Sequence, residues 1–525
     1  MRKAHDVATI RAAERALMAT VPPGTLMQRA AAGLASVCAG LAGTVYGARV
    51  VVLAGSGDNG GDALYAGARL ARRGARVVAV AAGGRVHEEG AAALRAAGGR
   101  VTGPGDPGLP DVIAAADLVL DGLLGIGGQG GLREPYSALA GLVAGARARG
   151  GAGTGAGVGP VVVAVDLPSG VDADSGVVDG PAVRADVTVT FGTWKPGLLI
   201  DPGASHAGVV ELVDIGLGPH LPPAVAAAFG VADVAALFRQ PPAESDKYRR
   251  GVLGIVAGSD RFTGAAALAV GAALRGGAGM IRLVSAEPAV AVVRQQWPEA
   301  VITVTGDGAA AGQEVAAAGR VQAWVAGPGM GTDEAARSRL AAVLATDLPV
   351  LVDADGLTLA AAEPGLLDRR APTLMTPHAG ELARLLGADP ADVAARRLEH
   401  ARAAAARFGV TVLLKGSTTV IAPGPDSGGD GEVLVNPTGT SWLATAGTGD
   451  VLSGLAGALL AQGLGVPQAA GAAAFLHGIA GRLAATGTGG ADTGAGGPIG
   501  AADVIGALPA AIRGARAAAA QPSPG

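Results

Sequence analysis

The stretch NPTGTSWLATAGTGDVLSGL, residues 436–455, joins a glycine-containing turn to an apolar run that is compatible with a helix. The glycines allow the backbone N–H groups of residues 447–449 to converge on an anion, and the helix start adds the positive end of its dipole. Asp450 stands at the same point. A carboxylate beside a bound phosphate is suited to handling a proton or a hydroxyl, so Asp450 is a candidate base. The plainer alternative is that Asp450 is only an N-cap.

The composition of the chain restricts its class. A length of 525 residues predicts roughly two to four domains. Lys and Arg (40) nearly balance Asp and Glu (44), which argues against a nucleic-acid partner. The N-terminus lacks an apolar signal segment, and no strongly apolar span is long enough for a bilayer, so we expect a cytoplasmic protein without a membrane partner. Cys38, the single cysteine, fits a reducing compartment and is expected to fill the core. Gly- and Ala-rich helices pack closely, which is compatible with a homo-oligomer.

The first half of the chain alternates short β-branched runs with helical periods. Parallel strands of the buried type are therefore predicted, in a doubly wound α/β layer structure. The Gly/Ala-rich segment 144–160 is expected to be a flexible surface insertion. The predicted strands are 49–55, 76–80, 117–125, 161–170, 185–192 and 208–216, and the predicted helices are 5–20, 24–43, 61–73 and 88–97.

The second half restarts the same alternation without repeating a motif of the first, which indicates a fusion of two domains. Pro-rich segments near 220–245 mark the boundary, so we predict domains at 1–222 and 223–525, each with three αβα layers. The chain after about 515 is expected to be mobile, and so is 485–498. The predicted strands are 251–259, 280–286, 321–327, 349–355 and 410–416, with a helix at 264–276 and a hairpin loop at 423–431.

Three oxygen-bearing side chains follow predicted strands of the first half. They are Asn59, Asp121 and Ser169. Because the carboxyl ends of parallel strands meet at one edge of the sheet, we expect these side chains to converge there. Any one of them alone would be interpreted as a cap or a turn residue. Together they predict a site for a hard cation.

The first half also carries four motifs in order: GSGDNGGDAL (55–64), DGLLGIG (121–127), DLPSG (166–170) and VTFGTWKPGLL (189–199). As a set they resemble the N-terminal, Rossmann-like epimerase domain of the bifunctional NAD(P)H-hydrate repair enzymes. The resemblance implies a K⁺ ion held by Asn59, Asp121 and Ser169. Asp58 stands where Asn is more usual and adds a negative charge near an anionic ligand. The implied hydrate-binding residues are Asp58, Asn59, Gly60, Gly61, Asp62, Gly125, Ile126, Gly127, Gly128, Gln129, Gly130, Gly131 and Asp166.

Asp166 and Lys195 are the predicted acid/base pair of this domain. Epimerisation at the hydrated carbon of the nicotinamide ring requires the hydroxyl to leave, or the ring to open, followed by readdition on the other face. A carboxylate within reach of that oxygen passes the proton. Lys195 would tune the carboxylate or hold a phosphate; alternatively, it is a surface lysine before a Pro-Gly turn.

The second half places five weak motifs at predicted strand ends, ahead of the 447–450 anion site. They are Gly264-Ala265, GPGMG (327–331), DADG (353–356), TPHAGE (376–381) and KGSTT (415–419). Lys415 is interpreted as a phosphate or ribose contact, with a solvated strand end as the alternative. His378 is a substrate contact or a structural residue. For Asp353 and Asp355, metal ligation and turn capping both stay open.

These motifs, with KYRRG (247–251) and AGTGDVLSG (446–454), resemble the ribokinase-like, ADP-dependent (S)-NAD(P)H-hydrate dehydratase domain of the same family. Ala379 and Ala446 replace the usual Pro and Gly without removing a functional group. The resemblance implies ADP as phosphoryl donor, with Mg²⁺ bridging its phosphates and Asp450 as the base. The implied nucleotide contacts are Lys415, Gly416, Ser417, Thr418, Thr419 and Gly449, and the implied hydrate contacts are Ala265, Gly331, His378 and Asp450.

The predicted function is therefore repair of hydrated nicotinamide cofactors. The small-molecule substrates NADHX and NADPHX would be epimerised by the first domain, and the second domain would dehydrate the (S) form to NAD(P)H, with ADP converted to AMP and phosphate. One alternative makes the second half a ribokinase-like kinase of a vitamin alcohol, which a stable phosphorylated product would reveal. Another makes the first half a non-catalytic binding module, which would not need Asn59, Asp121, Asp166, Ser169 and Lys195 together.

Overall fold

The computed structural model describes residues 1–128, 130–150, 159–238, 244–306, 311–425, 431–487 and 496–519. The chain forms two compact units. One is Lys3–Val225, and the other combines Met1–Arg2 with Ala226–Gly525. The two αβα domains expected from the sequence are thus present, and the units divide three residues after the predicted boundary at 222.

The N-terminal unit is built on a seven-stranded sheet within the described residues, in the order β4-β3-β2-β5-β6-β7-β8. Every pair of neighbours is parallel. The chain moves outward from β2 to β4 and then returns to place β5 beside β2, so the switch point of the topology lies between β2 and β5. The strands are β2 (Arg49–Ala54), β3 (Arg76–Ala81), β4 (Arg100–Thr102), β5 (Leu118–Gly122), β6 (Val161–Val165), β7 (Val187–Phe191) and β8 (Val209–Val213).

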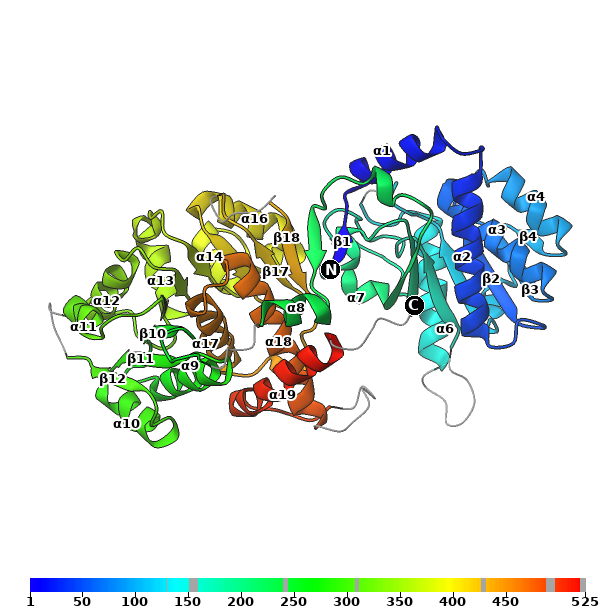
Figure 1. Ribbon diagram of the computed structural model, residues 1–525. Coiled ribbons are helices and arrows are strands. Elements are labelled where there is room, and N and C mark those ends of the chain that lie inside the picture. Colours follow the sequence, from blue (N-terminus) through cyan, green and yellow to red (C-terminus); the bar gives the residue numbers. More distant parts are fainter. Residues whose placement is uncertain are drawn as a thin grey trace. The chain divides into compact units, whose positions relative to one another are not determined.

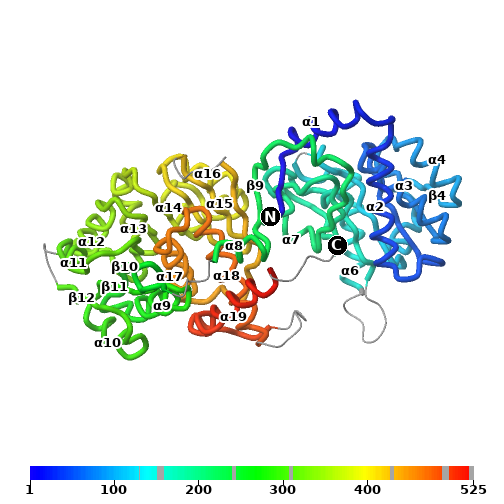
Figure 2. The backbone as a smooth tube through the Cα atoms, viewed as in Figure 1, coloured from blue at the N-terminus to red at the C-terminus, as the bar shows by residue number. Residues whose placement is uncertain are grey.

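Helices cover both faces of this sheet because alternate strand residues point to opposite sides. Val50 and Val52 pack with α2, α3 and α4, while Val51 and Leu53 pack with α5 and α6. Figures 1 and 2 show α3 between α2 and α4. Cys38 is buried in the first cluster, as predicted. The helices are α1 (Val7–Met18), α2 (Thr25–Ala42), α3 (Asp58–Arg72), α4 (Glu88–Ala96), α5 (Leu109–Ala114), α6 (Tyr136–Gly150) and α7 (Ala204–Ala207).

The second unit is built on a larger sheet in the order β1-β9-β18-β17-β16-β15-β14-β13-β10-β11-β12. Its centre is parallel, and β16, β17 and β18 are joined antiparallel. The switch point lies between β10 and β13. The strands are β1 (Arg2–Ala4), β9 (Ala226–Ala228), β10 (Val252–Val256), β11 (Met280–Ser285), β12 (Val301–Val304), β13 (Ala323–Ala326), β14 (Val350–Val352), β15 (Thr373–Met375), β16 (Thr411–Leu414), β17 (Thr419–Ala422) and β18 (Val433–Asn436).

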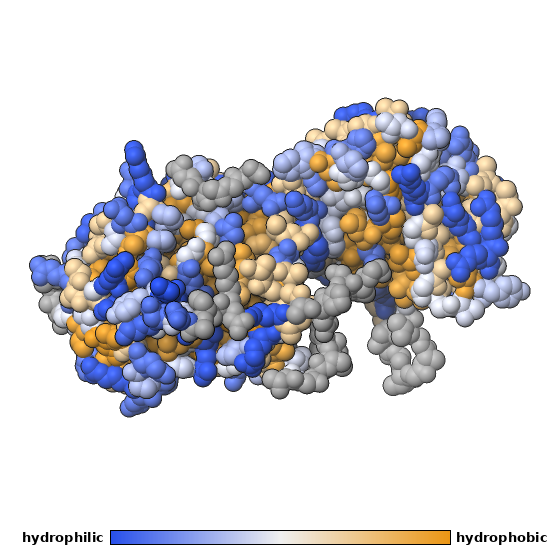
Figure 3. Space-filling view, in the orientation of Figure 1, coloured by the Kyte–Doolittle hydropathy of each residue, from blue (hydrophilic) through white to orange (hydrophobic). Residues whose placement is uncertain are grey.

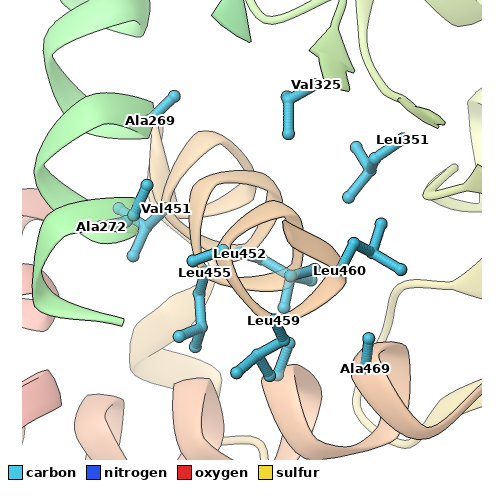
Figure 4. Close-up of a cluster of buried hydrophobic side chains, with 14 of the residues drawn as sticks. Ala269, Ala272, Val325, Leu351, Val451, Leu452, Leu455, Leu459, Leu460 and Ala469 are labelled. Carbon is cyan, nitrogen blue, oxygen red and sulfur yellow. The ribbon is translucent and has the colours of Figure 1, made fainter. Parts of the chain in front are cut away.

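Helix α17 (Thr448–Ala461), which begins in the glycine-containing stretch 436–455, lies in the core of the second unit. Its Val451, Leu455 and Leu459 are buried among side chains of the sheet and of the neighbouring helices (Figure 4). The other helices are α8 (Val231–Leu237), α9 (Thr263–Arg275), α10 (Glu287–Gln296), α11 (Ala311–Ala317), α12 (Glu334–Leu344), α13 (Asp355–Ala362), α14 (Ala379–Leu386), α15 (Pro390–Ala395), α16 (Arg397–Phe408), α18 (Val466–Thr486) and α19 (Ala501–Ala519).

Several predicted boundaries are wrong. The predicted helix at 61–73 begins three residues earlier, and the short strands β1, β4, β9 and β12 were not predicted. The end of the chain was expected to be mobile from about 515, but α19 continues to Ala519. Parts of the predicted insertion (151–158), of the hairpin loop (426–430), of the segment 485–498 (488–495) and of the tail (520–525) lie outside the described residues.

No helix in the described ranges is long and apolar enough to cross a membrane. In the view of Figure 3, hydrophilic and hydrophobic residues are interspersed over the surface of each unit.

Candidate active sites

A pocket of about 650 Å³ opens in the N-terminal unit. It lies at the carboxyl ends of β2 and β5, where a ligand crevice is expected for this topology. Its walls come from α1, α2 and α3, from the segments after β2 and β5, and from the ends of β6 and β7.

Asp166 and Lys195 form a buried ion pair at this pocket. Lys195 Nζ lies 2.5 Å from Asp166 Oδ1, and the lysine is only 1 % exposed. The same oxygen accepts from Phe191 N (3.1 Å) and Thr190 Oγ1 (3.2 Å). Asp166 has φ 67°, a conformation that a non-glycine residue rarely adopts and that aims its side chain back toward β7. Lys195 is therefore not the surface lysine of the alternative interpretation.

Asp121 and Ser169 are joined directly. Ser169 Oγ donates to Asp121 Oδ1 (2.6 Å), and Ser169 N donates to Oδ2 (2.8 Å). Burial raises the pKa of Asp121 to about 6. Asn59 packs against Gly122 and Gly125, and its Nδ2 is buried without a hydrogen-bond partner. Among the described residues no group of three His, Cys, Asp or Glu side chains could hold a metal, and the predicted cation set contains a single carboxylate.

The DNGGD segment, predicted to be a glycine loop, is instead the first turn of α3. Asp58, Asn59 and Asp62 line the pocket. Gly60 and Gly61 are buried and lie against neighbouring groups. A Cβ added to Gly60 would stand 2.2 Å from the Gly55 carbonyl oxygen, and a Cβ added to Gly61 would stand 2.9 Å from the His87 ring. The glycines here permit close packing of the helix.

Asp62 has an unusual environment on the pocket wall. Its Oδ1 is buried and has no hydrogen-bond partner. Burial, followed by the negative charges of Asp166 and Asp58, raises the pKa of Asp62 well above its usual range. The pocket therefore holds Asp166, paired with Lys195, near a carboxyl group whose pKa is raised.

The loop after β5 contributes its first part to the pocket. Gly125, Ile126, Gly127 and Gly128 line it. The lining residues that the structure describes do not include Gly130 and Gly131; an added Cβ on Gly131 would stand 1.8 Å from the Asp179 carbonyl oxygen. Gln129 lies outside the described residues.

Sequence reasoning missed pocket residues that come from other helices. Arg11 and Glu14 of α1, Tyr65 of α3 and His87, the N-cap of α4, all line the pocket. The sequence of α1 gave one indication of this role, namely two charged residues spaced three apart on an amphipathic helix.

In the second unit, Asp353 and Lys415 form the centre of a buried network at the ends of β14 and β16. Lys415 Nζ donates to Asp353 Oδ1 (2.8 Å), and Ser453 Oγ of α17 donates to Oδ2 (2.7 Å). Glu381 Oε2 lies 3.7 Å from Lys415 Nζ. Burial alone would lower the pKa of Lys415, but the carboxylates of Asp353 and Glu381 raise it. Lys415 is thus a partly buried cation paired with Asp353, not a solvated strand end.

The start of α17 lies beside this network. Gly447, with φ 86°, is its N-cap, and an added Cβ on Gly449 would stand 3.5 Å from Lys415 Nζ. Asp450 is in the first turn, and burial, followed by the charge of Asp353, raises its pKa to about 7. The turn, the lysine and the candidate base predicted from the sequence are therefore brought together.

The loops after β13 and β14 are tied to each other. Gly331 N donates to Asp355 Oδ2 (2.9 Å), and Ala354 between the two aspartates has φ 48°. Ala265, at the start of α9, packs against Gly329 of the GPGMG loop. Asp355 thus orders a turn, and Asp353 is engaged by Lys415 and Ser453, which favours structural and electrostatic roles over metal ligation for both.

His378 and the KGSTT segment (415–419) agree only in part with the contacts predicted for them. His378 Nδ1 accepts from Gly380 N (3.0 Å) and caps α14, with Glu381 returning a bond to His378 N, while the ring is largely exposed. Gly416 and Ser417 are exposed, but Thr418 and Thr419 are buried.

Two buried groups near this site were not predicted. Ser453 holds Asp353 from α17, one helical turn after Asp450. His477 of α18 is buried near Thr448, and burial lowers its pKa to about 4. Serine and histidine inside apolar helices gave no distinctive signal.

Fold and sites together define an α/β enzyme in which each unit holds a carboxylate near the ends of its strands. A family model for the YjeF-related protein N-terminus matches residues 23–197, and one for NAD(P)H-hydrate dehydratase matches 253–493. The bifunctional NAD(P)H-hydrate repair enzyme of Mycobacterium leprae is 48 % identical over 476 residues, 90 % of this chain and 91 % of that protein. The enzyme of the same description from Corynebacterium glutamicum is 35 % identical over 88 % of each chain. The chain belongs to the family of bifunctional NAD(P)H-hydrate repair enzymes.

Among solved structures, the ADP/ATP-dependent NAD(P)H-hydrate dehydratase of Bacillus subtilis, co-crystallised with ATP and Mg²⁺, is 28 % identical. It matches 55 % of this chain and 97 % of its own, with a TM-score of 0.45. A ribokinase-like superfamily protein of Enterococcus faecalis is 23 % identical over 55 % of this chain and 95 % of its own, with a TM-score of 0.47.

Proposed function

We propose that this chain epimerises (R)- and (S)-NAD(P)HX in its N-terminal unit and dehydrates (S)-NAD(P)HX to NAD(P)H in its second unit. The observation that carries the proposal is a carboxylate at each crevice in the position to handle a hydroxyl proton. Asp166 faces a pocket at the β2/β5 switch point, and Asp450 lies in the first turn of α17 beside Lys415.

In the epimerase unit, Asp166 is the proton carrier. Its Oδ1 is occupied by Lys195, Phe191 and Thr190, which leaves Oδ2 for the hydroxyl of the hydrate. Lys195 pairs with the carboxylate and fixes its orientation. The proton taken as the hydroxyl leaves or the ring opens returns to the oxygen that adds on the other face. Asp62 favours the protonated form and offers a hydrogen-bond donor on the same wall.

The residues Asn59, Asp121 and Ser169 fit a K⁺ ion. They offer one buried carboxylate and neutral oxygens, the ligand types that a hard cation prefers. A cation there would supply positive charge near the hydrate and compensate the burial of Asp121. K⁺ therefore belongs to this proposal as the ion of the epimerase site.

In the dehydratase unit, hydroxide is a poor leaving group and is first activated. Asp450 accepts the proton of the hydrate's hydroxyl as that oxygen bonds to the terminal phosphorus of ADP. The bond between that phosphorus and its bridging oxygen breaks and releases AMP. The C–O bond of the resulting phosphate ester, which is the hydrate's original C–O bond, then breaks to release phosphate, and loss of a ring proton restores NAD(P)H. Mg²⁺, when bound, neutralises charge on the phosphates.

The chain's own groups stabilise the charge that develops during the transfer. The N–H groups at the start of α17 point to the crevice, and Lys415 lies beside Gly449. We assign nucleotide contact to Lys415, Gly416, Ser417 and Gly449, and hydrate contact to Ala265, Gly331 and His378 along with Asp450. Thr418 and Thr419 would act by holding the turn, since both are buried. The proposal also includes a cytoplasmic location and a homo-oligomer.

The alternative of a vitamin-alcohol kinase with a non-catalytic N-terminal module is not favoured by a family whose named members are bifunctional repair enzymes over both units. The test is recovery of reduced-nicotinamide absorbance from mixed NADPH-hydrate epimers with Mg²⁺, K⁺ and either ADP or ATP. Wild type should recover both epimers. Asp166→Ala should recover the (S) fraction at once and the rest only at the spontaneous rate, and Asp450→Ala should recover nothing. No recovery by wild type with either nucleotide would overturn the proposal.

A further inference from the structure

Helix α1 presents one side to the N-terminal pocket. Ile10, Ala13 and Leu17 are buried in the core, while Arg11, Glu14 and Met18 line the pocket. The spacing of 11, 14 and 18 places these three on one stripe. The matched family segment begins at residue 23, so α1 precedes it.

The charges around the pocket leave Arg11 as the cation available for a ligand. Five carboxylates line the pocket, namely Glu14, Asp58, Asp62, Glu89 and Asp166. Lys195 is buried and donates to Asp166 Oδ1, Thr190 Oγ1 and the Phe191 carbonyl oxygen. Arg11 is exposed and makes no hydrogen bond or ion pair with a residue that the structure describes.

The guanidinium of Arg11 lies over the loop after β5. Its Nη2 would be 3.4 Å from a Cβ added to Gly127. In the part of the chain that is described, the backbone N–H groups of Gly125, Ile126 and Gly127 donate to no partner. Arg11 and these amides therefore present donors to one place on the solvent side of the pocket, while Asp166 and Lys195 lie on its buried side.

We propose that Arg11 of α1, together with the amides of residues 125–127, binds a phosphate group of the hydrated dinucleotide and so orients its nicotinamide end toward Asp166. This inference rests on the proposed epimerase function. In this inference α1 supplies the positive charge that binds the ligand's phosphate. The five carboxylates of the pocket would otherwise repel that anionic group. The bound group is either a 5′-phosphate, which all the hydrates carry, or the 2′-phosphate, which only NADPHX carries.

The test compares Arg11→Ala with Arg15→Ala, because Arg15 is an exposed arginine on the same helix outside the pocket lining. Interconversion of the epimers is followed by chromatography without nucleotide, using the hydrates of NMNH, NADH and NADPH. Loss of one charge-assisted contact should raise the epimerase KM about 10- to 100-fold in Arg11→Ala. The kcat should change little, Arg11→Lys should recover part of the loss, and Arg15→Ala should match wild type.

A raised KM for all three hydrates supports contact with the 5′ side, and one confined to NADPHX supports contact with the 2′-phosphate. An unchanged KM for every hydrate, or an equal rise in Arg15→Ala, would overturn the inference while leaving the epimerase function intact. If wild type interconverts the epimers no faster than buffer does, the proposed epimerase function fails, and this inference with it. An unchanged epimerase kcat reports that the N-terminal unit of each variant is folded, and dehydration of (S)-NADPHX by the second unit should be the same in all variants.

Discussion

Asp450 and Asp166 are two carboxylates that their surroundings prepare differently. Burial raises the pKa of Asp450 to about 7, with Asp353 as the next contribution, so its charge changes near neutral pH. Asp166 is held instead in a buried ion pair with Lys195. A base that takes a proton from an alcohol works best with a pKa near the working pH, whereas a carboxylate that both takes and returns a proton needs a fixed orientation.

Asp450→Asn should lower the dehydration rate by about 10²- to 10⁴-fold, the usual contribution of a general base. In wild type, the carboxylate acts only when ionised, so kcat should rise with pH through about 7 and level off above it. The measurement is a pH profile of kcat between 5.5 and 9 with (S)-NADPHX at saturation. A wild-type rate that is flat across this range would contradict the role of Asp450.

Lys195→Met should unfold the N-terminal unit more readily, because it leaves Asp166 buried beside Phe191 and Thr190 without its cation. Removing one partner of a buried pair costs about 3–5 kcal/mol. Amide hydrogen exchange in β7 reports on this unit alone. The double variant Asp166→Asn/Lys195→Met removes both charges and should recover most of the protection. If it exchanges as fast as the single variant, lost packing and not the stranded charge is the cause.

Helix α17 links packing in the second unit to its chemistry. Gly454, one turn after Asp450, lies against α9, where an added Cβ would stand 2.1 Å from the Ala269 carbonyl oxygen. The two helices thus approach at backbone contact distance. Any displacement of α17 moves its first turn, and with it Asp450 and the N–H groups that face the crevice.

Gly454→Ala should destabilise the second unit by about 1–3 kcal/mol through overpacking and also lower the dehydration kcat. The control is Gly506→Ala in α19, where an added Cβ meets nothing within 4 Å. That control should be neutral or stabilising by about 0.4–1 kcal/mol. Urea unfolding and initial rates measure both effects. Equal behaviour of the two variants would show that the α9–α17 contact does not position the site.

The sequence predicted strands and helices where the pattern was long and apolar, as in Arg49–Ala54 and α17, because burial on both faces leaves a continuous hydrophobic run. It failed at β4 and β12, which are three and four residues long and lie at sheet edges. It also assigned the glycines of DNGGD to a loop, since the sequence does not reveal that Gly60 faces the Gly55 carbonyl oxygen. Asp450 was predicted from the glycine turn and the helix start, and Asp166 from its place after a predicted strand. Arg11 required the placement of α1.

The two units have complementary chemistry. The dehydratase, as proposed, accepts one epimer, and the epimerase converts the other to it, so a single chain recovers both. The N-terminal unit places its pocket at the topological switch point between β2 and β5, and the second unit places its polar network at the ends of β14 and β16. Neither site borrows a residue from the other among those assigned above.

Equal amounts of Asp166→Ala and Asp450→Ala should therefore complement each other in solution. The first variant retains the dehydratase and the second the epimerase, and the (S)-hydrate diffuses between them. We expect the mixture to recover the full absorbance from mixed epimers, at a rate that increases with the concentration of the Asp450→Ala chain while epimerisation limits the reaction. Each variant alone is the control. If the mixture stops at the (S) fraction and then follows the spontaneous rate, the two activities depend on an intact partner site in the same chain, and the independence of the units is wrong.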